Sequence, residues 1–421
     1  MKTSTLNPSK KDKSTPADEI PVDWDRCLVE SLAERGSGHT PNREMPEYWN
    51  GGIKWVSLTD SNKLDRRFIR ATTSEISAAG IRHSSAVLHP KNTVILSRDA
   101  GVGKSAILGE PMAVSQHFIA WRCGPYLDPL YFYYWLQHKK PYFERMAVGS
   151  TIKTIGLSVF RKLDGAFPPI KEQRRIADML CAWDEALDKI ESLIERKEQQ
   201  RNASATKLLS GRHRLRGFTN HWSKVRLDEL LRFEDRYVEF DDRHQYDLVS
   251  VRRRSGGVFF RQTLRGDEIM TKVMKVVHFG DFLISRMQAV HGAIGMVREG
   301  CDGMFASDSY EVLVARNPEL LYMPFLDWIS RMKWFWQIIL RCSHGVHIEK
   351  MTFSLPDFMR HEIEIPSDVS EQRAIAGILD MRDSEIRLLR QLHGALNLQK
   401  CGLIQRLLSG KLRVPNYATV G

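Results

Sequence analysis

Two stretches of the chain carry hydrophobic residues at alternating intervals of about four and three positions. In the first stretch these residues are Ile176, Leu180, Trp183, Leu187, Ile190 and Ile194. In the second stretch, which Arg382 and His393 interrupt, they are Ile375, Leu379, Ile386, Leu389, Leu396, Leu403 and Leu407. This heptad spacing predicts two long helices, each with an apolar stripe that has to be buried. About 38 residues at 1.5 Å each give a helix of roughly 55–60 Å.

The two helical stretches are copies of one sequence. Residues 172–177 read Glu-Gln-Arg-Arg-Ile-Ala, and residues 371–376 read Glu-Gln-Arg-Ala-Ile-Ala. Residues 207–211 read Lys-Leu-Leu-Ser-Gly and residues 406–410 read Arg-Leu-Leu-Ser-Gly, so one offset of 199 residues joins both pairs. Such a match at both ends indicates an internal duplication. The chain is therefore two tandem units, each a variable module followed by a preserved helix.

The simplest partner for each apolar stripe is the stripe of the other copy. An antiparallel pair would let the two helices cover each other and would place the variable modules at opposite ends. A coiled coil used only for dimerisation remains the alternative.

The variable modules have the pattern of mixed α/β structure. Short β-rich runs between turn residues predict strands at Ile53–Leu58, Thr93–Ser97, Asp247–Val251, Lys275–Phe279 and Tyr310–Val314. Each module also has one apolar, helix-like stretch, Leu130–Gln137 or Tyr322–Leu340. We expect the aromatic side chains of the first stretch to serve in packing.

Composition favours a polyanion as partner and argues against a membrane protein. The 421 residues include 62 Lys and Arg against 51 Asp and Glu, a formal net charge of +11. No apolar run approaches the ~20 residues that cross a bilayer, and the N-terminus lacks the apolar core of a signal peptide. The six cysteines form no CxxC pair, which fits reduced thiols in the cytoplasm rather than a disulfide framework or a zinc site.

No catalytic motif stands out. Gly101-Val-Gly-Lys-Ser105 lacks the first glycine of a phosphate-binding loop, because Arg98 occupies that position. The second copy has Ala289-Val-His-Gly-Ala-Ile294 there, without Lys-Ser. Neither copy has a zinc, nuclease or methyltransferase signature. We therefore expect no catalytic residue, no metal and no cofactor on this chain.

Basic and polar residues in turns are the candidates for contact with a polyanion. Arginine suits this task, because its fork pairs with phosphate and with the guanine edge. The DNA-binding candidates are Arg66, Arg67, Arg98, Lys104, Ser150, Thr151, Lys153, Arg252, Arg253, Arg254, Arg286, His291, His347 and Lys350. For any single one of them, an ordinary solvated surface remains the alternative. The helix-pair and partner-interface candidates are Ile176, Leu180, Trp183, Leu187, Ile190, Ile375, Leu379, Ile386 and Leu389.

The repeated set of motifs resembles the specificity (S) subunit of type I restriction–modification systems. The resemblance rests on Pro-Pro-Ile-Lys-Glu-Gln-Arg-Arg-Ile-Ala at 168–177, its second copy up to Ala376, the two Leu-Leu-Ser-Gly endings and Gly-Ser-Thr-Ile-Lys-Thr at 149–154. It extends from about Val22 to Val414. The second copy departs at Gly345-Val-His, where the usual Ser/Thr is absent.

The resemblance implies an α+β fold with two tandem α/β target recognition domains separated by two long helices that form an antiparallel coiled coil. The expected segments are a tail at 1–21, recognition domain 1 at 22–167, helix region 1 at 168–215, recognition domain 2 at 216–366, helix region 2 at 367–414 and a tail at 415–421.

The same resemblance implies a non-catalytic subunit that reads a bipartite double-stranded DNA target, one half-site per recognition domain. Two modification (methyltransferase) subunits would dock on the helices, and whether restriction (endonuclease/translocase) subunits join them is left open. S-adenosylmethionine, Mg and ATP would then belong to the partner subunits, in the cytoplasm. The alternative is a coiled-coil scaffold that binds nucleic acid without reading its sequence.

Overall fold

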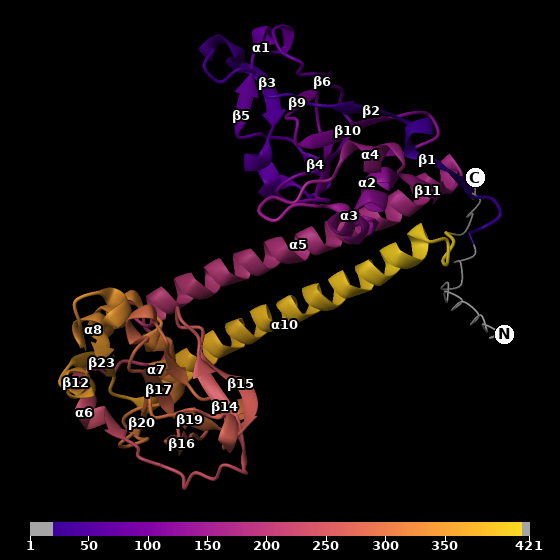
Figure 1. Cartoon of the computed structure of the whole chain (residues 1–421). Coiled ribbons are helices and arrows are strands. Elements are labelled where there is room, and N and C mark those ends of the chain that lie inside the picture. The colour runs from indigo at the N-terminus through magenta and orange to yellow at the C-terminus, as the bar shows by residue number, and fades with distance from the viewer. Residues whose placement is uncertain (1–19, 415–421) are drawn as a thin grey trace, which may run out of the picture. The chain divides into compact units, whose positions relative to one another are not determined.

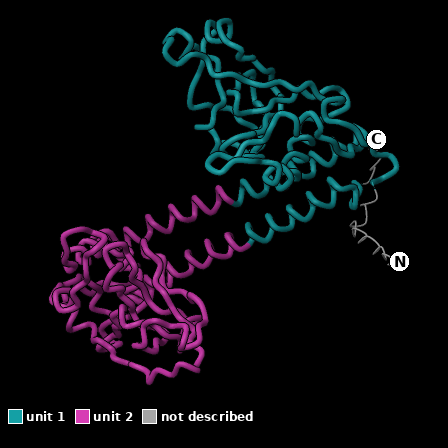
Figure 2. Tube along the Cα trace, in the orientation of Figure 1, with its two compact units in different colours: residues 1–190, 392–421 teal, residues 191–391 magenta. Residues whose placement is uncertain are grey.

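The computed structural model describes residues 20–414 (Figure 1). The predicted tails at 1–21 and 415–421 lie outside the described residues, apart from Ile20 and Pro21. The chain divides into two compact units (Figure 2). Unit 1 comprises residues 1–190 and 392–421, and unit 2 comprises residues 191–391. Each unit thus contains one variable module, called module 1 or module 2 below, and a segment of each long helix.

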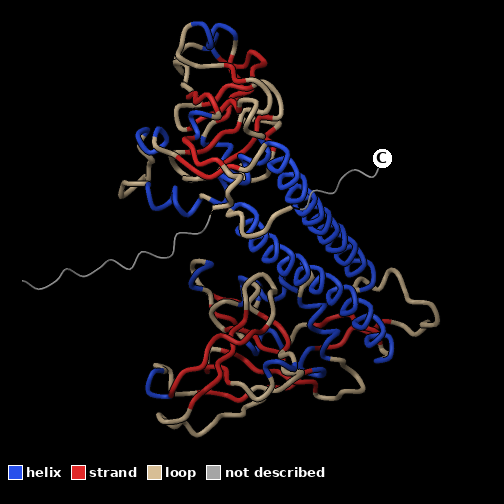
Figure 3. Tube along the Cα trace, turned by 90° about the vertical axis from the view of Figure 1, so that its right-hand side faces the viewer, coloured by secondary structure: helices blue, strands red, loops and turns tan. Residues whose placement is uncertain are grey.

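Both predicted long helices are present, and the α+β fold is confirmed. Helix α5 spans Ile170–Leu208 and helix α10 spans Val369–Leu408, with 39 and 40 residues respectively. Both run without interruption, whereas the strands belong to the modules (Figure 3). At 1.5 Å per residue each helix is about 60 Å long.

Ion pairs between the helices confirm that they run antiparallel. In unit 1, the ammonium of Lys400 pairs with the carboxylate of Asp184. In unit 2, Arg201 pairs with Asp383. Residue numbers fall on one helix as they rise on the other, and the two pairs are related by the repeat offset, since Lys400 corresponds to Arg201 and Asp383 to Asp184. The duplication has therefore preserved an ion pair in both units.

The residues predicted for the helix seam divide into two groups. Ile176 and Leu180 are buried in the core of module 1, and Ile375 and Leu379 are buried in the core of module 2. The others lie farther along the helices: Leu187 and Ile386 are buried, whereas Trp183, Ile190 and Leu389 are half-buried. The start of each stripe therefore packs against the helix's own module, which the heptad pattern alone did not indicate.

The Glu and Gln of the repeated motif make the same hydrogen bonds in both units. The buried carboxylate of Glu172 accepts hydrogen bonds at 2.7 Å from Arg413, and Glu371 accepts them in the same way from Arg214, at 2.7 and 2.6 Å. A buried carboxylate is costly unless it is paired, so each glutamate depends on its arginine. In the next position, the amide of Gln173 donates to the carbonyls of Tyr126 and Pro168, and Gln372 repeats the arrangement in unit 2.

Module 1 is built from two main sheets with the strand orders β2-β10-β7-β8-β4 and β5-β3-β9-β6, and from the pair β1-β11. Its strands are β1 Asp25–Leu28, β2 Ala33–Ser37, β3 Trp49–Val56, β4 Phe68–Ile69, β5 Ser74–Ile76, β6 Leu88–His89, β7 Val94–Ser97, β8 Ser105–Leu108, β9 Met112–Val114, β10 Phe118–Cys123 and β11 Asp164–Phe167. Its helices are α1 Ala78–Arg82, α2 Pro129–His138, α3 Lys140–Met146 and α4 Leu157–Arg161.

Module 2 repeats this topology. Its sheets have the orders β13-β20-β17-β18 and β15-β14-β19-β16, with the pairs β12-β23 and β21-β22. Its strands are β12 Trp222–Arg226, β13 Leu231–Phe233, β14 Gln245–Val251, β15 Val258–Arg265, β16 Met274–Val276, β17 Phe282–Ser285, β18 Ile294–Met296, β19 Phe305–Ser307, β20 Tyr310–Ala315, β21 Ser343–His344, β22 Thr352–Phe353 and β23 Glu362–Pro366. Its helices are α6 Leu227–Leu230, α7 Met323–Ser330, α8 Lys333–Arg341 and α9 Leu355–Met359.

Apart from β4, the main sheets of the two modules correspond strand by strand. Strand β3 pairs in parallel with β9, and β14 pairs in parallel with β19, at the same place in each topology. Strand β4 has no counterpart in module 2, because it arises within the long connection between β3 and β5. Each of the five predicted strands coincides with an observed one, although the predicted run Lys275–Phe279 extends beyond the end of β16.

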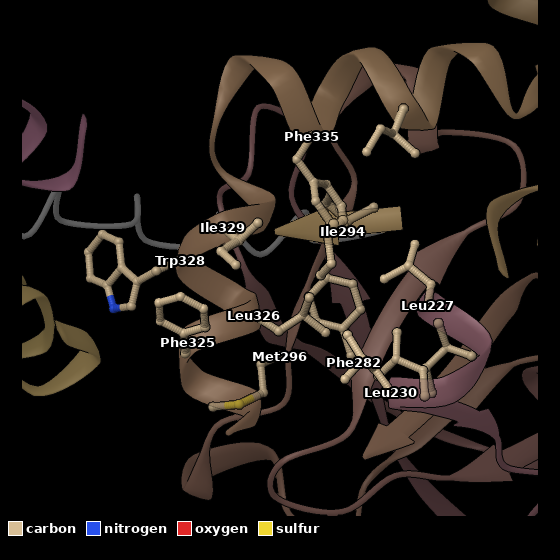
Figure 4. Packing of buried hydrophobic residues seen from close by; sticks show 14 of the residues in the cluster. Leu227, Leu230, Phe282, Ile294, Met296, Phe325, Leu326, Trp328, Ile329 and Phe335 are labelled. Atoms are coloured by element: carbon tan, nitrogen blue, oxygen red, sulfur yellow. The ribbon is translucent and has the colours of Figure 1, made fainter. Parts of the chain in front are cut away.

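The apolar stretches of both modules form the cores, as predicted. In module 1, Tyr131, Phe132, Tyr134 and Trp135 of α2 are all buried. In module 2, side chains from α7 and α8 pack on strands β17 and β18 (Figure 4). The predicted single stretch Tyr322–Leu340 is in fact two helices, which separate at Arg331 and Met332.

Each long helix is followed within three residues by a glycine that lies beside a tryptophan ring. Gly211 and Gly410 have φ angles of 67° and 75°, a left-handed conformation that glycine adopts without strain. A Cβ on Gly211 would lie 3.1 Å from the ring of Trp222, and one on Gly410 would lie 2.5 Å from the ring of Pro21 and 3.6 Å from that of Trp24. In unit 1 the two ends of the described chain therefore meet.

Within residues 20–414, no helix combines the length and apolar character that a membrane span requires. The same part of the chain has no group of three or more His, Cys, Asp or Glu residues placed to hold a metal ion. All six cysteines lie in this range and are free thiols.

Candidate nucleic-acid interface

Three loops occupy equivalent positions in the two modules. Loop A connects β3 to β5 in module 1, residues 57–73, and β14 to β15 in module 2, residues 252–257. Loop B follows β7 or β17, residues 98–104 and 286–293. Loop C precedes α4 or α9, residues 149–153 and 345–351. All fourteen candidate DNA-binding residues lie on these loops.

One backbone hydrogen bond places loop C beside loop B in both modules. The N–H of Ile155 donates to the carbonyl of Arg98 at 2.9 Å, and the N–H of Phe353 donates to the carbonyl of Arg286 at 2.8 Å. Loop C is a hairpin in both modules, closed by the bridge between Val148 and Thr154 or by strands β21 and β22. The missing Ser/Thr after Gly345 therefore does not alter the hairpin.

In module 2, loop A is attached to loop B as well. The N–H of Arg254 donates to the carbonyl of His291 at 2.7 Å, and the N–H of Ser255 donates to the carbonyl of Gly292 at 2.8 Å. Both Arg254 and Ser255 have positive φ angles, 58° and 54°, which non-glycine residues rarely adopt. The turn is thus held in one conformation by its neighbour.

The arginines of this turn are exposed and carry uncompensated charge. Arg252, Arg253 and Arg254 are all exposed, and none takes part in an ion pair with another described residue. The guanidinium of Arg252 lies 4.0 Å from the ring centre of Phe259, a cation–π contact that keeps it near β15.

Arg286 and His291 of loop B are already engaged with acidic groups. Arg286 pairs with Asp308 at 2.7 Å and lies 3.7 Å from Glu311. Burial disfavours the charged form of Asp308, but hydrogen bonds from Arg286 and Tyr237 outweigh it and lower the pKa of Asp308. The ring of His291 lies 3.4 Å from Glu349 of loop C. By contrast, His347 and Lys350 of loop C are exposed.

In module 1, loops B and C enclose a surface pocket of about 500 Å³. Lys104 and Lys153 line it, together with Lys140 of α3. The ammonium of Lys104 also donates to the carbonyl of Ser61 at 3.1 Å, which joins loop A to loop B. Ser150, Thr151 and Lys153 are exposed at the tip of loop C. Lysines from three elements therefore line this pocket, together with Glu144 of α3.

The remaining basic candidates of module 1 behave differently from one another. Arg66 is exposed, whereas the guanidinium of Arg67 points onto helix α5. It donates to Asp188 at 2.8 Å and to the sulfur of Cys181 at 2.9 Å, and it lies 3.7 Å from Asp184. Arg98 is only 21% exposed and lies 3.9 Å from Asp99, so it contributes more to loop B than to the surface.

The sequence did not single out Lys140, which lies 36 positions after Lys104. Its ammonium pairs with Asp65 of loop A at 2.9 Å, so it joins the pocket through the fold rather than through a local motif. The only local signal was its position next to Lys139, shortly before the Gly-Ser-Thr sequence.

Comparison with known proteins shows similarity to type I specificity subunits. The model of the type I restriction modification DNA specificity domain matches residues 21–199. The type I restriction enzyme MjaIX specificity subunit of Methanocaldococcus jannaschii is 28% identical over 190 residues, which is 45% of this chain and 42% of that protein. The MjaVIII specificity subunit of the same organism is 20% identical over 419 residues, 94% of this chain and 95% of that protein. Residues 21–199 thus match the type I DNA specificity domain, and nearly the whole chain is similar to type I specificity subunits.

Solved structures show that the fold is shared along the whole specificity subunit. The crystal structure of the S subunit from M. genitalium aligns with a TM-score of 0.57 at 17% identity, over 94% of this chain and 98% of that one. A chain from a structure of type I restriction–modification complex assembly aligns with a TM-score of 0.54 at 15% identity, over 94% of this chain and all of that one. Specificity subunits are non-catalytic, which confirms the prediction that this chain is not itself an enzyme.

Proposed function

We propose that this specificity subunit recognises a bipartite double-stranded DNA target, with one half-site read by each module. The observation that carries the proposal is the repetition of loops A, B and C at equivalent positions in both modules. Two copies of one recognition face within a single chain are suited to two separate segments of one DNA molecule.

The recognition domains in this proposal are residues 22–167 and 216–366, and the helix regions are 168–215 and 367–414. The first range holds the pocket with Lys104 and Lys153, and the second holds the turn with Arg252–Arg254. Arg66, Ser150, Thr151, His347 and Lys350 are further contacts in this proposal, because they are exposed on the same loops. Four other candidates stabilise the loop conformation instead, since their side chains face acidic neighbours: Arg67, Arg98, Arg286 and His291.

The helices have two roles in the proposal: they set the unread spacer between the half-sites and they dock two modification subunits. Helix α10 leaves leucines exposed in both units, Leu388 in unit 2 at 63% and Leu398 in unit 1 at 73%. Exposed apolar side chains on a helix are typical of a protein interface. The modification subunits, and restriction subunits where they are present, would bring S-adenosylmethionine, Mg and ATP to the complex, which we place in the cytoplasm.

Exchange of one module tests the proposal. The full chain is expressed with its modification subunit, and methylated adenines are mapped across the genome by sequencing. Replacing residues 22–167 with the corresponding module of another specificity subunit should change one half of the methylated motif and leave the other unchanged. A complex that is active but shows no sequence motif would instead support a scaffold that binds nucleic acid without reading it.

Shortening the helices tests the spacer. Removal of one heptad from each helix shortens it by about 10 Å, which corresponds to about three base pairs. The same mapping should then report both half-sites unchanged with a shorter spacer between them. An unchanged spacer in a complex that still methylates would refute this role of the helices.

A further inference from the structure

The turn of loop A in module 2 presents charged side chains from an unusually constrained backbone. The N–H of Arg252 donates to the carbonyl of Gly257 at 3.0 Å and closes the hairpin. The bonds from Arg254 and Ser255 to His291 and Gly292 then attach the turn to loop B. A side chain held by a fixed backbone loses less conformational entropy on binding, so its direction can contribute to specificity.

Of the three arginines, Arg254 is the one whose own N–H is bonded to the neighbouring loop. Arg252 is held over Phe259, close to the strand. The guanidinium of Arg254 is exposed and is not in an ion pair with any residue between 20 and 414. Arg286, in contrast, has two carboxylates within 4 Å. Arg254 thus has a guanidinium without an ion-pair partner among residues 20–414, on a backbone that a hydrogen bond to loop B holds in place.

We propose that Arg254 is a specificity-determining residue that reads a guanine in the half-site bound by module 2. This inference rests on the proposed function, because it assigns a base contact within that recognition face. The two parallel N–H groups of an arginine match the O6 and N7 acceptors of guanine in the major groove, whereas adenine offers an N–H donor in place of O6. Arg252 and Arg253 contribute charge towards the phosphates on either side of the contact.

Two substitutions of Arg254 change the guanidinium group without changing the conformation of the turn. Arg254→Gly removes the side chain and suits the positive φ of 58°, so the hairpin keeps its shape. Arg254→Lys keeps the charge and removes the fork. Arg243→Ala is the matched control, since Arg243 is an exposed arginine of the same module that precedes β14, whereas Arg254 follows it. Strand β14 has seven residues, so its two ends, near Arg243 and near Arg254, lie about 23 Å apart.

The measurement combines methylation mapping with binding of the purified complex to duplexes that vary at one base pair at a time. Wild-type complex should discriminate against substitution of one G·C pair in the second half-site by about 10- to 100-fold. In both Arg254 variants this discrimination should fall to within about threefold, while every other position stays specified. The Arg243→Ala complex should keep the wild-type motif. Thermal unfolding of each variant should match the wild type.

Two results would overturn the inference. The first is an unchanged motif in the Arg254→Gly complex. The second is an equal loss of affinity for all sequences with a lower salt dependence, which is the behaviour of a phosphate contact. Failure of the underlying function has a different outcome, because the wild-type complex would then give no bipartite motif at all.

Discussion

Loop A joins the same two strands in both modules, yet its arginines are used in opposite ways. In module 1, Arg67 is turned inward, and its guanidinium contacts Asp188 and Cys181 of helix α5. In module 2, Arg254 is turned outward on a short turn that contacts loop B. Loop A thus carries an arginine that attaches module 1 to helix α5, namely Arg67. In module 2 it carries an arginine that is available to a ligand, namely Arg254.

The difference follows from the length of the connection. Loop A of module 1 has room for the turn at Leu58–Lys63 and for strand β4, which brings Arg67 to the helix. In module 2 the six residues of loop A form only a tight hairpin. A guanidinium that already has carboxylate partners gains little from a phosphate, so neighbouring acidic groups separate structural arginines from binding ones.

Substitution of Arg67 should have the largest effect on stability. Arg67→Ala leaves Asp184 and Asp188 without their shared partner, although Lys400 still contacts Asp184. We expect a loss of about 1–3 kcal/mol in the free energy of unfolding, measured by urea denaturation of the full chain. Arg66→Ala is the control, because Arg66 is the exposed neighbour, and it should change stability by less than about 0.5 kcal/mol. Equal effects of the two substitutions would contradict the division of roles.

Acid should loosen loop A of module 1 through Asp60. Burial raises the pKa of this carboxyl, but hydrogen bonds from Lys63, Thr73 and Ser57 outweigh burial and leave the pKa below 3.8. A lowered pKa in the folded state contributes stability that is present above about pH 4 and is lost as the pH falls through the folded value. The urea midpoint of the wild type should therefore decrease more between pH 5 and pH 3 than that of Asp60→Asn. Parallel pH profiles would show that Asp60 does not hold the loop.

The smallest effect on stability is expected at the exposed lysines of loop C. Lys153→Ala and Lys350→Ala should leave the free energy of unfolding within about 0.5 kcal/mol of the wild type, because both side chains are exposed. Each should weaken DNA binding by the complex about equally for all sequences and reduce the slope of log affinity against log salt by about one. A change of the recognised motif in either variant would assign that lysine a base contact instead.

Periodic and repeated features of the chain could be predicted from the sequence. The heptad stripes predicted the two helices, and the 199-residue offset predicted two copies of one unit. The equivalent ion pairs in the two units became visible only in the structure. The aromatic stretches predicted the cores, since a run such as Phe132 to Trp135 has to be buried.

The partners of individual basic residues could not be predicted in this way. Arg67 and Arg254 both lie in arginine clusters, and only the fold brings Asp188, 121 positions away, to the first of them. Lys140 reaches the pocket for the same reason. An ion pair between distant segments leaves no local pattern, so a sequence-based candidate list combines residues that bind with residues that shape the loops.

The meeting of the two chain ends in unit 1 bears on how the protein is made. Leu407 and Leu408, near the end of α10, are buried in the core of module 1, and Arg413 pairs with both Asp23 and Glu172. Unit 2, in contrast, is one continuous stretch, residues 191–391. On the ribosome, unit 2 can therefore be completed first, although it is encoded later than module 1.

The core of unit 1 can be completed only after Leu407, Leu408 and Arg413 have been translated. We expect a chain released at residue 391 to contain a protease-resistant unit 2 and a protease-sensitive module 1, which limited proteolysis would show. The segment from residue 392 to residue 414 thus links the packing of module 1 to translation of the part of the chain that follows unit 2.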